Sequence, residues 1–395
     1  MVDSSVDTAP AGIEAGDAPR FELSDAQRRA REEFREFTRT RIAPHAGAWD
    51  RDQAIPLDVV DALRAQGYLG ALLPAEVGGQ GMDPVTYGLL TEELGKACSS
   101  VRSLLTVHDM VGEVVQRWGS RELRAELLPR IAGAELLCAF ALSEPGVGSD
   151  AQSLAAEARR DGDGYALHGI KKWITFGQIA DLFLVFARTE DGIAAFLVDG
   201  DAPGLRRVPI EGVTGTRAAL LAELHLEGCR VAAERRVGRP GFGFTHIAST
   251  GLDQGRYSVA WGAVGIAQAC LDACLEYTEE REQFGAPIRE HQLVRAKLTD
   301  MIVGIRAARL VCLRAGYLRA KKDPDASAET LGAKYLASTT ATRVASDAVQ
   351  LHGANGLTDA YPVGRYLRDA KVTEVIEGST QIQQLLIAKH PVQEL

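Results

Sequence analysis

The sequence lacks several features that would indicate other classes of protein. Its six cysteines are scattered and form no C-x-x-C pair, so we expect no disulfide, no metal site and a reducing, cytoplasmic location. Lysine and arginine form no long block and the net charge is −9, which argues against nucleic acid as a partner. No apolar run approaches the length of a membrane span. Residues 1–20 lack the basic start and apolar stretch of a secretory signal, and we predict a disordered lead there.

The rest of the chain divides into three zones by its hydrophobic periodicity. Residues 21–136 show helical spacing, and Ser24 with Gln27 makes a capping box before the first helix. Residues 137–238 contain short β-type runs separated by Asp-Gly turns, and residues 239–395 are helical again. We therefore predict an α+β, mainly α fold, with an N-terminal helical domain, a central antiparallel β domain and a C-terminal helical bundle.

The expected elements follow from the same patterns. Helices are predicted at Ala26–Ile42, Leu57–Gln66, Asp83–Lys96, Arg121–Ala132, Gln254–Arg281, His291–Lys321, Ser327–Leu351 and Val372–Lys389. Strands are predicted at Phe183–Ala187, Ala194–Val198 and Leu224–Leu226.

The last quarter of the chain carries a carboxylate in an unusual setting. Glu377 is followed by Gly378 and has the apolar neighbours Val375, Ile376 and Ile382. Glycine lets the backbone approach a ligand closely, and apolar surroundings raise the pKa of a carboxyl group toward neutrality. Glu377 is therefore a candidate general base, although a solvated residue in a helix-ending turn fits the same pattern.

Three other segments contain residues that suit ligand binding. The loop Phe140–Asp150 holds two glycines and flanking hydroxyl groups, whose backbone N–H groups could hold a phosphate, although many such loops are plain turns. Trp173 lies among β-branched residues, which usually indicates core packing. Arg281 stands at a helix end, where a cation favours the helix dipole.

Taken in order, these segments resemble the signature motifs of the flavin-dependent acyl-CoA dehydrogenase family. The matching strings are Phe140-Ala-Leu-Ser-Glu-Pro-Gly-Val-Gly-Ser-Asp150, Trp173-Ile-Thr175, Arg281-Glu-Gln-Phe-Gly-Ala-Pro-Ile288, Gln350-Leu-His-Gly-Ala-Asn-Gly356 and Val375-Ile-Glu-Gly-Ser-Thr-Gln381. The resemblance covers nearly the whole chain after about residue 22. It implies an FAD enzyme with a C-terminal four-helix bundle, assembled as a homodimer or homotetramer.

The resemblance also assigns residues to the cofactor. Those expected to hold FAD are Phe140, Leu142, Ser143, Ser149, Trp173, Thr175, Ser379 and Gln381. Those expected to reach the FAD of a neighbouring subunit are Arg281, Gln283, Phe284, Gln350, Gly353 and Ala354. The chain departs from the family at two of these motifs, because relatives often have Asn where Phe176 stands and Gly where Ala354 stands.

The family carries its catalytic base at one of two positions. One is the Glu before Gly in the last motif, which is Glu377 here, and the other is occupied here by Gly255, which has no side chain. The resemblance therefore favours Glu377 as the base that removes an α-proton while a β-hydride passes to FAD. Asp253, Arg256 and Gly378 are expected to bind the substrate, with a structural salt bridge as the alternative for Asp253 and Arg256.

The segment Cys98–Met110 corresponds to the family helix that lines the acyl pocket. Arg102, Ser103 and Thr106 stand there, where a fatty-acyl enzyme would need apolar residues. Arg102 either pairs with a protein carboxylate or recognises a hydroxyl or carboxylate on a short, polar acyl group. Cys98–Ser103 and Arg256–Gly265 also resemble acyl-carrier-protein dehydrogenases of polyketide extender-unit pathways.

The sequence thus predicts an FAD-dependent acyl-thioester dehydrogenase. Its substrate would be carried by CoA or by an acyl carrier protein, and its electron acceptor would be a flavoprotein or oxygen. Six arginines of the β domain and its exit could meet an acidic carrier protein, or form an ordinary solvated surface: Arg206, Arg207, Arg217, Arg235, Arg236 and Arg239. The alternatives are a flavin oxidase or monooxygenase on the same scaffold, and a non-catalytic scaffold that binds the thioester or its carrier.

Overall fold

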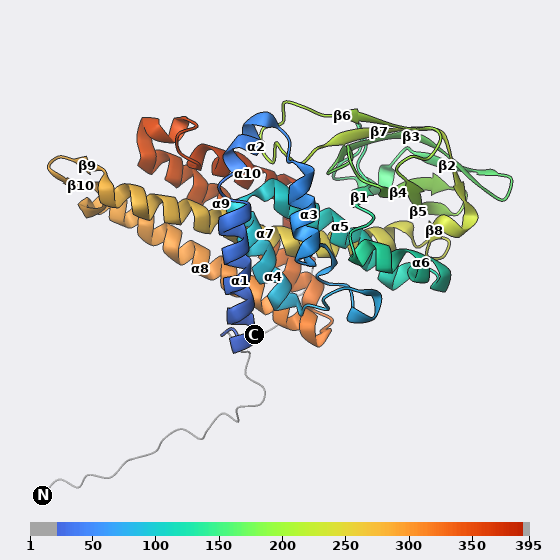
Figure 1. Cartoon of the computed structure of the whole chain (residues 1–395), viewed down its shortest axis with the longest axis horizontal. Helices are drawn as coiled ribbons and strands as arrows, with labels where there is room; N and C mark the ends of the chain where they lie inside the picture. The colour runs from blue at the N-terminus through green and yellow to red at the C-terminus, as the bar shows by residue number, and fades with distance from the viewer. Residues whose placement is uncertain (1–21, 390–395) are drawn as a thin grey trace, which may run out of the picture.

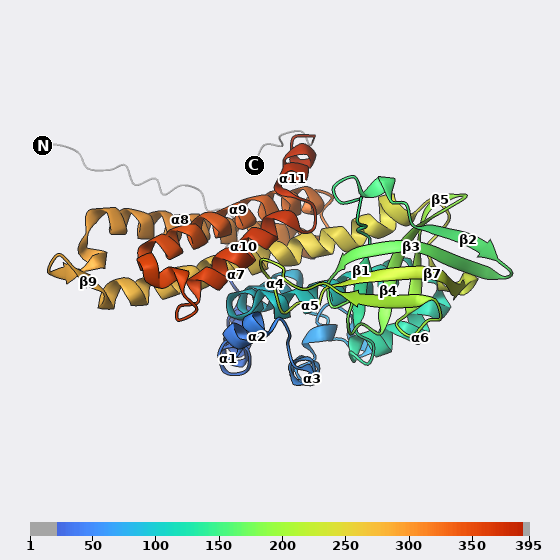
Figure 2. The same ribbon diagram turned by 90° about the horizontal axis from the view of Figure 1, so that it is seen from above.

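The computed structural model describes residues 22–389, so the predicted disordered lead at residues 1–20 lies outside it. The molecule is elongated, with the β domain at one end and the tip of the C-terminal bundle at the other (Figures 1 and 2). The N-terminal helices pack along the middle. This arrangement confirms the predicted order of helical domain, β domain and helical bundle.

The N-terminal domain contains six α-helices. They are α1 (Asp25–Arg41), α2 (Ala46–Asp52), α3 (Leu57–Ala65), α4 (Pro84–Ala97), α5 (Ser99–Trp118) and α6 (Arg121–Ala132). The predicted capping box is present at α1, because the Ser24 hydroxyl accepts from the Gln27 N–H at 3.2 Å and the Gln27 side chain accepts from the Ser24 N–H at 3.0 Å. Helices α4 and α5 are almost entirely buried, which places α5 where it can line an internal site.

The β domain forms one sheet of eight strands. They are β1 (Cys138–Ala141), β2 (Glu157–Asp161), β3 (Gly164–Ile174), β4 (Leu182–Thr189), β5 (Gly192–Asp199), β6 (Leu205–Pro209), β7 (Ala222–Ala232) and β8 (Arg236–Val237). The strand order is β6-β7-β3-β2-β4-β5-β8, and β1 pairs with β4. Most neighbouring strands pair antiparallel as predicted, and the exceptions involve β4, which pairs in parallel with both β1 and β2. The long connections before β4 allow this, since parallel neighbours cannot be joined by a tight turn.

The C-terminal domain contains five α-helices and a small hairpin. They are α7 (Ser249–Glu280), β9 (Glu282–Gln283), β10 (Ala286–Pro287), α8 (Gln292–Lys321), α9 (Ala326–His352), α10 (Val363–Val375) and α11 (Thr380–Ile387). Helices α7 to α10 make up the four-helix bundle. The single predicted helix Val372–Lys389 is wrong, because the chain turns between α10 and α11 at Glu377 and Gly378, which both have left-handed φ angles.

Shorter helical turns join these elements. The 3₁₀ turns are Tyr68–Gly70, Ala75–Val77, Ala151–Ser153, Ala233–Arg235, Ile288–Glu290 and Gly353–Leu357, and a π-helical turn at Gly243–Ala248 leads into α7.

Helix α7 is the central helix of the molecule. Its small residues let α4 approach closely, since a Cβ on Gly95 would lie 2.5 Å from the carbonyl oxygen of Gly262. Contrary to the expectation from the sequence, helix Gly243–Glu280 is long and apolar enough to cross a membrane, yet 78% of its most apolar window is buried inside the protein. That burial is typical of a core helix rather than of a lipid-facing one.

Candidate active site

The turn between α10 and α11 presents Glu377 on a strained backbone. Glu377 has φ +55° and Gly378 has φ +89°, a left-handed pair that glycine adopts easily and glutamate does not. Donors from two helices hold the Glu377 carbonyl: Arg256 Nε of α7 at 3.1 Å and Gln383 Nε2 of α11 at 3.2 Å. The next carbonyl, of Gly378, accepts from Gln383 at 3.1 Å and from Lys334 Nζ of α9 at 2.8 Å.

The Glu377 carboxyl group is partly buried and forms no ion pair within the described chain. Its Oε2 atom is buried and has no hydrogen-bond partner among residues 22–389. Burial raises the pKa of Glu377 to about 7, while the nearby cations Arg256, Arg102 and Lys334 act in the opposite direction. A carboxyl group with this pKa is ionised in about half of the molecules at neutral pH, as suits a general base.

Gly255 of α7 lies directly against this carboxyl group. A Cβ atom on Gly255 would stand 2.7 Å from both Cδ and Oε2 of Glu377, and 2.9 Å from Sδ of Met110 on α5. The two positions that the sequence resemblance offers for the base, 255 and 377, therefore lie side by side in this fold. Only Glu377 supplies a carboxyl group there.

Arg102 of α5 is buried without a carboxylate partner. It is 1% exposed, and its guanidinium donates to the hydroxyl groups of Thr106 and Ser103, each at 3.0 Å. No ion pair joins Arg102 to a carboxylate within the described chain, so the salt-bridge alternative for Arg102 is wrong, and its Nε atom has no partner there. Burial lowers the pKa of Arg102 to about 10, which leaves the group ionised at neutral pH.

Helix α7 makes room for this arginine. A Cβ atom on Gly262 would lie 2.7 Å from Cδ of Arg102, and the Ser258 hydroxyl lies 2.6 Å from that of Thr106.

Further buried polar atoms between α4, α5 and α7 are unsatisfied within residues 22–389. They are Tyr87 Oη, Asp109 Oδ2, Gln254 Nε2 and Trp261 Nε1. Burial raises the pKa of Asp109 well above its ordinary value, which favours the neutral form of this acid. Sequence reasoning missed these residues. The sequence does contain a sign of Asp109: it follows Arg102 by seven positions, and this spacing puts both charged residues on one face of a helix.

Asp253 and Arg256 have structural partners. Asp253 pairs with Arg319 of α8 at 2.5 Å, and Arg256 donates to the Glu377 carbonyl. Asp253 therefore makes the salt bridge that the structural alternative expects. Arg256 instead holds the backbone of the candidate base, Glu377.

The β domain brings one group of predicted FAD residues together beside β1 and β3. Trp173 has φ +64° and is 52% exposed, with the half-buried Thr175 two residues on. Phe140 lies at the edge of the core, where its ring packs against Phe186 at 5.0 Å. The exposed face of Trp173 is suited to a flat ring such as a flavin.

The loop after β1 is held by hydrogen bonds at its first residues, whereas its two glycines have free space around them. The carbonyl of Leu142 accepts from Lys171 Nζ at 3.1 Å, and Lys171 pairs with Glu144 at 2.7 Å. Ser143 accepts through its carbonyl from the Lys172 N–H, and Ser149 is exposed. A Cβ atom on Gly146 or Gly148 would meet nothing within 4 Å, so backbone N–H groups there are accessible to a phosphate.

Phe176 does not face this surface. It is fully buried, has φ +55° and donates its N–H to the Ala219 carbonyl at 2.8 Å. The chain accommodates the departure from the family pattern by turning the ring into the core.

A second group of predicted FAD residues lies at the tip of the bundle next to β9, away from helix α11 (Figure 2). Tyr277 connects the segment that begins at Arg281 with the segment that begins at Gln350. Its hydroxyl group contacts the His352 carbonyl at 3.3 Å and the Asn355 side chain at 2.9 Å. The members are exposed, with Phe284 at 95%: Arg281, Gln283, Phe284, Gln350, Gly353 and Ala354. One chain therefore does not bring this group to its own Glu377.

The remaining residues predicted to bind FAD or a carrier protein either make contacts within their own chain or are exposed. The Ser379 hydroxyl caps α11 by accepting from the Ile382 N–H at 3.4 Å, and Gln381 is exposed. Three of the arginines proposed for a carrier protein pair with carboxylates of their own chain: Arg206 with Glu227, Arg235 with Glu126 and Arg236 with Asp191. No cluster of three or more potential metal ligands occurs among residues 22–389.

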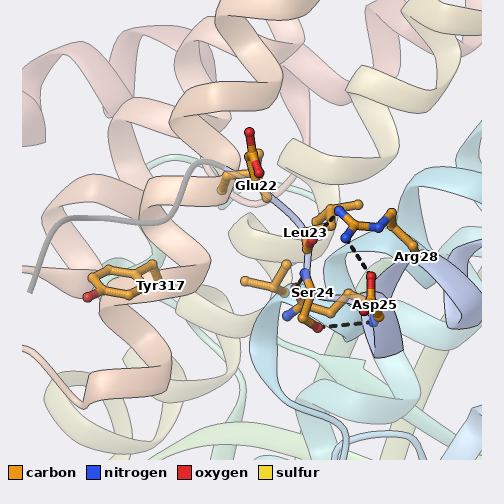
Figure 3. Close-up of a pocket in the computed structure, with 9 residues that line it drawn as sticks. Glu22, Leu23, Ser24, Asp25, Arg28 and Tyr317 are labelled. Atoms are coloured by element: carbon orange, nitrogen blue, oxygen red, sulfur yellow. Dashed lines mark hydrogen bonds and ion pairs between the residues drawn. The ribbon is translucent and has the colours of Figure 1, made fainter. Parts of the chain in front are cut away.

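A surface pocket of about 720 Å³ lies elsewhere, at the start of α1 (Figure 3). Its lining includes Leu23, Arg28 and Tyr317, and Arg28 is already bound to Asp25 and to the Leu23 carbonyl. The pocket shares no residue with the site around Glu377.

Comparison with known proteins agrees with this geometry. Three family models match in succession: the acyl-CoA dehydrogenase N-terminal domain at residues 24–135, the middle domain at 139–229 and the C-terminal domain at 241–391. The mouse (Mus musculus) mitochondrial short-chain specific acyl-CoA dehydrogenase is 37% identical over 376 residues, covering 93% of this chain and 90% of that protein.

Solved structures show the same relationship. A glutaryl-CoA dehydrogenase from Mycobacterium smegmatis, in complex with FADH2, is 30% identical with a TM-score of 0.88, covering 94% of this chain and 96% of that one. FkbI, described as serving biosynthesis of the methoxymalonyl extender unit of FK520, is 33% identical with a TM-score of 0.84, covering 91% and 98%. The chain therefore belongs to the acyl-CoA dehydrogenase family, the FAD-dependent oxidoreductases that act on CH–CH groups.

Proposed function

We propose that this protein desaturates a short, polar acyl thioester and that Glu377 is its catalytic base. The observation that carries the proposal is the Glu377 carboxyl group, whose Oε2 atom is buried without a partner and whose backbone turn is held by Arg256, Gln383 and Lys334. FAD, when bound, supplies the acceptor for the hydride that leaves the β-carbon.

Glu377 would take the α-proton of the thioester onto its carboxylate. Because the pKa of Glu377 lies at about 7, the carboxylate is present at neutral pH and still basic enough to accept a proton. Burial then favours the neutral acid that forms. Among residues 22–389, no hydrogen bond uses the Glu377 backbone N–H as a donor, so this N–H could stabilise the thioester carbonyl as charge develops. A donor in such a position is commonly worth about 10²–10³ in rate.

Arg102 and the polar atoms near it support a polar acyl group. An ionised arginine without a carboxylate partner is costly to bury, and a hydroxyl or carboxylate of the substrate would lower that cost. The unsatisfied atoms of Tyr87, Asp109 and Gln254 offer further hydrogen bonds nearby. The likeness to FkbI agrees with an acyl-carrier-protein thioester, with CoA as the other carrier.

The other assignments made from the sequence remain proposals. They are the residues that bind FAD, the homodimer or homotetramer, the flavoprotein or oxygen acceptor and the cytoplasmic location. The exposed group around Phe284 supports an oligomer, because these residues could reach FAD only in a second subunit.

The decisive experiment is anaerobic bleaching of the bound flavin by a panel of short acyl-CoA and acyl-carrier-protein thioesters. Glu377→Gln should keep FAD and thioester binding but slow flavin reduction by about 10²–10⁴. Glu374→Gln is the matched control, since Glu374 lies one turn earlier and pairs with Lys371. Full reduction by Glu377→Gln would remove Glu377 from this role. Rapid oxygen consumption by reduced enzyme would indicate an oxidase, and purification without flavin a non-catalytic scaffold.

A further inference from the structure

Lys334 of α9, which bonds to the turn that carries Glu377, is a buried cation whose charge the proposed reaction does not yet use. Its side chain is fully buried, and Nζ donates to the carbonyl oxygens of Gly378 at 2.8 Å and Glu374 at 3.4 Å. No carboxylate forms an ion pair with it within the described chain. The comparable cation in the β domain, Lys171, is equally buried but pairs with Glu144 at 2.7 Å. Lys334 therefore bears a desolvation cost that no neighbouring ion pair offsets.

The charges that face Lys334 come from the helices around the Glu377 turn. Glu377 acts most strongly on it, followed by Arg256 of α7 and then Glu374 of α10, while burial lowers the pKa of Lys334 to about 8. Glu377 in turn faces Arg256, Arg102 of α5 and Lys334. Lys334 is thus still ionised at the pH where Glu377 titrates. It also stands at the last carbonyls of α10, where a cation is favoured by the helix dipole.

We propose that Lys334 is a positioning residue for Glu377: it fixes the left-handed turn through the Gly378 carbonyl and keeps the neighbouring carboxylate ionised through its charge. The role rests on the proposed function, since it acts through the base rather than on the substrate. The hydrogen bond and the charge are separate contributions. The bond holds the backbone from which Glu377 projects, whereas the charge sets the pH at which Glu377 becomes active.

The sign of the charge effect is fixed. A nearby cation stabilises the carboxylate, so removing it must raise the pKa of Glu377 above about 7. The acid limb of the rate profile would then move to higher pH. A residue that only fills space would change the rate by the same factor at every pH.

The test uses the FAD-loaded enzyme in three variants of Lys334 and one control. Lys334→Met removes both charge and hydrogen bond, Lys334→Gln removes the charge but keeps a donor, and Lys334→Arg keeps the charge. Lys371→Met is the control. Lys371 lies on the neighbouring helix α10 but, unlike Lys334, it is exposed and pairs with a carboxylate, that of Glu374. For each, we would measure the pH profile of anaerobic flavin reduction by the best thioester, and titrate the Glu377 carboxyl by infrared difference spectroscopy against Glu377→Gln.

We expect the acid limb and the infrared titration of Glu377 to move up by about one pH unit in Lys334→Met and Lys334→Gln. They should stay in place in Lys334→Arg and Lys371→Met. An equal loss of rate at every pH with an unmoved titration, or failure of both neutral variants to fold, would overturn the proposal. If no thioester reduces the wild-type flavin, the proposed function fails, whereas the infrared titration still decides the role of Lys334.

Discussion

Replacing Arg102 by Met tests whether this arginine serves the substrate or the fold. The guanidinium makes two hydrogen bonds, each about 1.5–3 kcal/mol for a charged group. Against them stands a desolvation penalty of several kcal/mol for an ion buried without a carboxylate. The two contributions nearly cancel, and neither acceptor is left unpaired, since Ser103 also bonds to Ser99 and Thr106 to Ser258. Arg102→Met should therefore change the free energy of unfolding by less than about 1 kcal/mol, instead of the 2–5 kcal/mol usual for truncating a large buried side chain.

The same change should alter substrate preference strongly. Losing one charge-assisted hydrogen bond to the acyl group, about 1.5–3 kcal/mol, corresponds to a fall of about 10- to 150-fold in kcat/KM for hydroxylated or carboxylated acyl thioesters. Butyryl thioester, which makes no such bond, should be affected little. The assays are urea unfolding of the holoenzyme and anaerobic flavin reduction with both substrates.

Arg309→Met is the matched control for stability. Arg309 pairs with the buried Glu92 at 2.8 Å, and its loss would leave that acid with the longer ion pair to Arg31 at 3.2 Å, so we expect a cost of about 2 kcal/mol. Equal effects of Arg102→Met on polar and butyryl thioesters would return Arg102 to a structural role, as would destabilisation as large as that of Arg309→Met.

Four further predictions follow from the geometry. Flavin reduction should become faster as pH rises through about 7, because the ionised form of Glu377 is the active one, and a rate independent of pH between 5 and 9 would contradict it. Gly255→Ala should displace the Glu377 carboxyl and lower kcat by about 10²-fold while FAD stays bound, as measured by stopped-flow absorbance. Trp173→Ala should weaken FAD retention, measured by dialysis, yet leave apoprotein stability within about 0.5 kcal/mol because the ring is half exposed. Ser24→Ala should lower stability by about 1 kcal/mol without changing activity, measured by urea unfolding and flavin reduction.

The long segments with a regular hydrophobic period were predicted well, because such a period buries its apolar residues in only one type of secondary structure. The helix at Arg121–Ala132 matches α6 residue for residue, and the three predicted strands lie inside β4, β5 and β7. The failure at Val372–Lys389 has a definite cause. Apolar residues keep their helical spacing across the turn between α10 and α11, and only Gly378 marks the turn in the sequence. The left-handed conformation of Glu377 depends on hydrogen-bond donors from three other helices. Tertiary hydrogen bonds of this kind cannot be read from a local window.

The site was predicted in part for the same reason. Glu377 and Arg102 stood out because a lone charge in an apolar segment is visible in sequence. Lys334 carries that signal too, since it lies among the buried residues Ala333, Ala337 and Ala341 of α9. It was overlooked because many helix lysines extend their charge into water. Its fully buried state depends on α10 and α11 covering that face, which is a property of the fold.

The closeness of Gly255 to Glu377 means that two stretches of chain, more than a hundred residues apart, reach the same point in the fold. A proton acceptor could be placed there either from helix α7 or from the turn between α10 and α11. Relocating the acid would therefore be an economical evolutionary step, open to a pair of substitutions. What would differ is the direction from which the carboxyl group approaches the substrate.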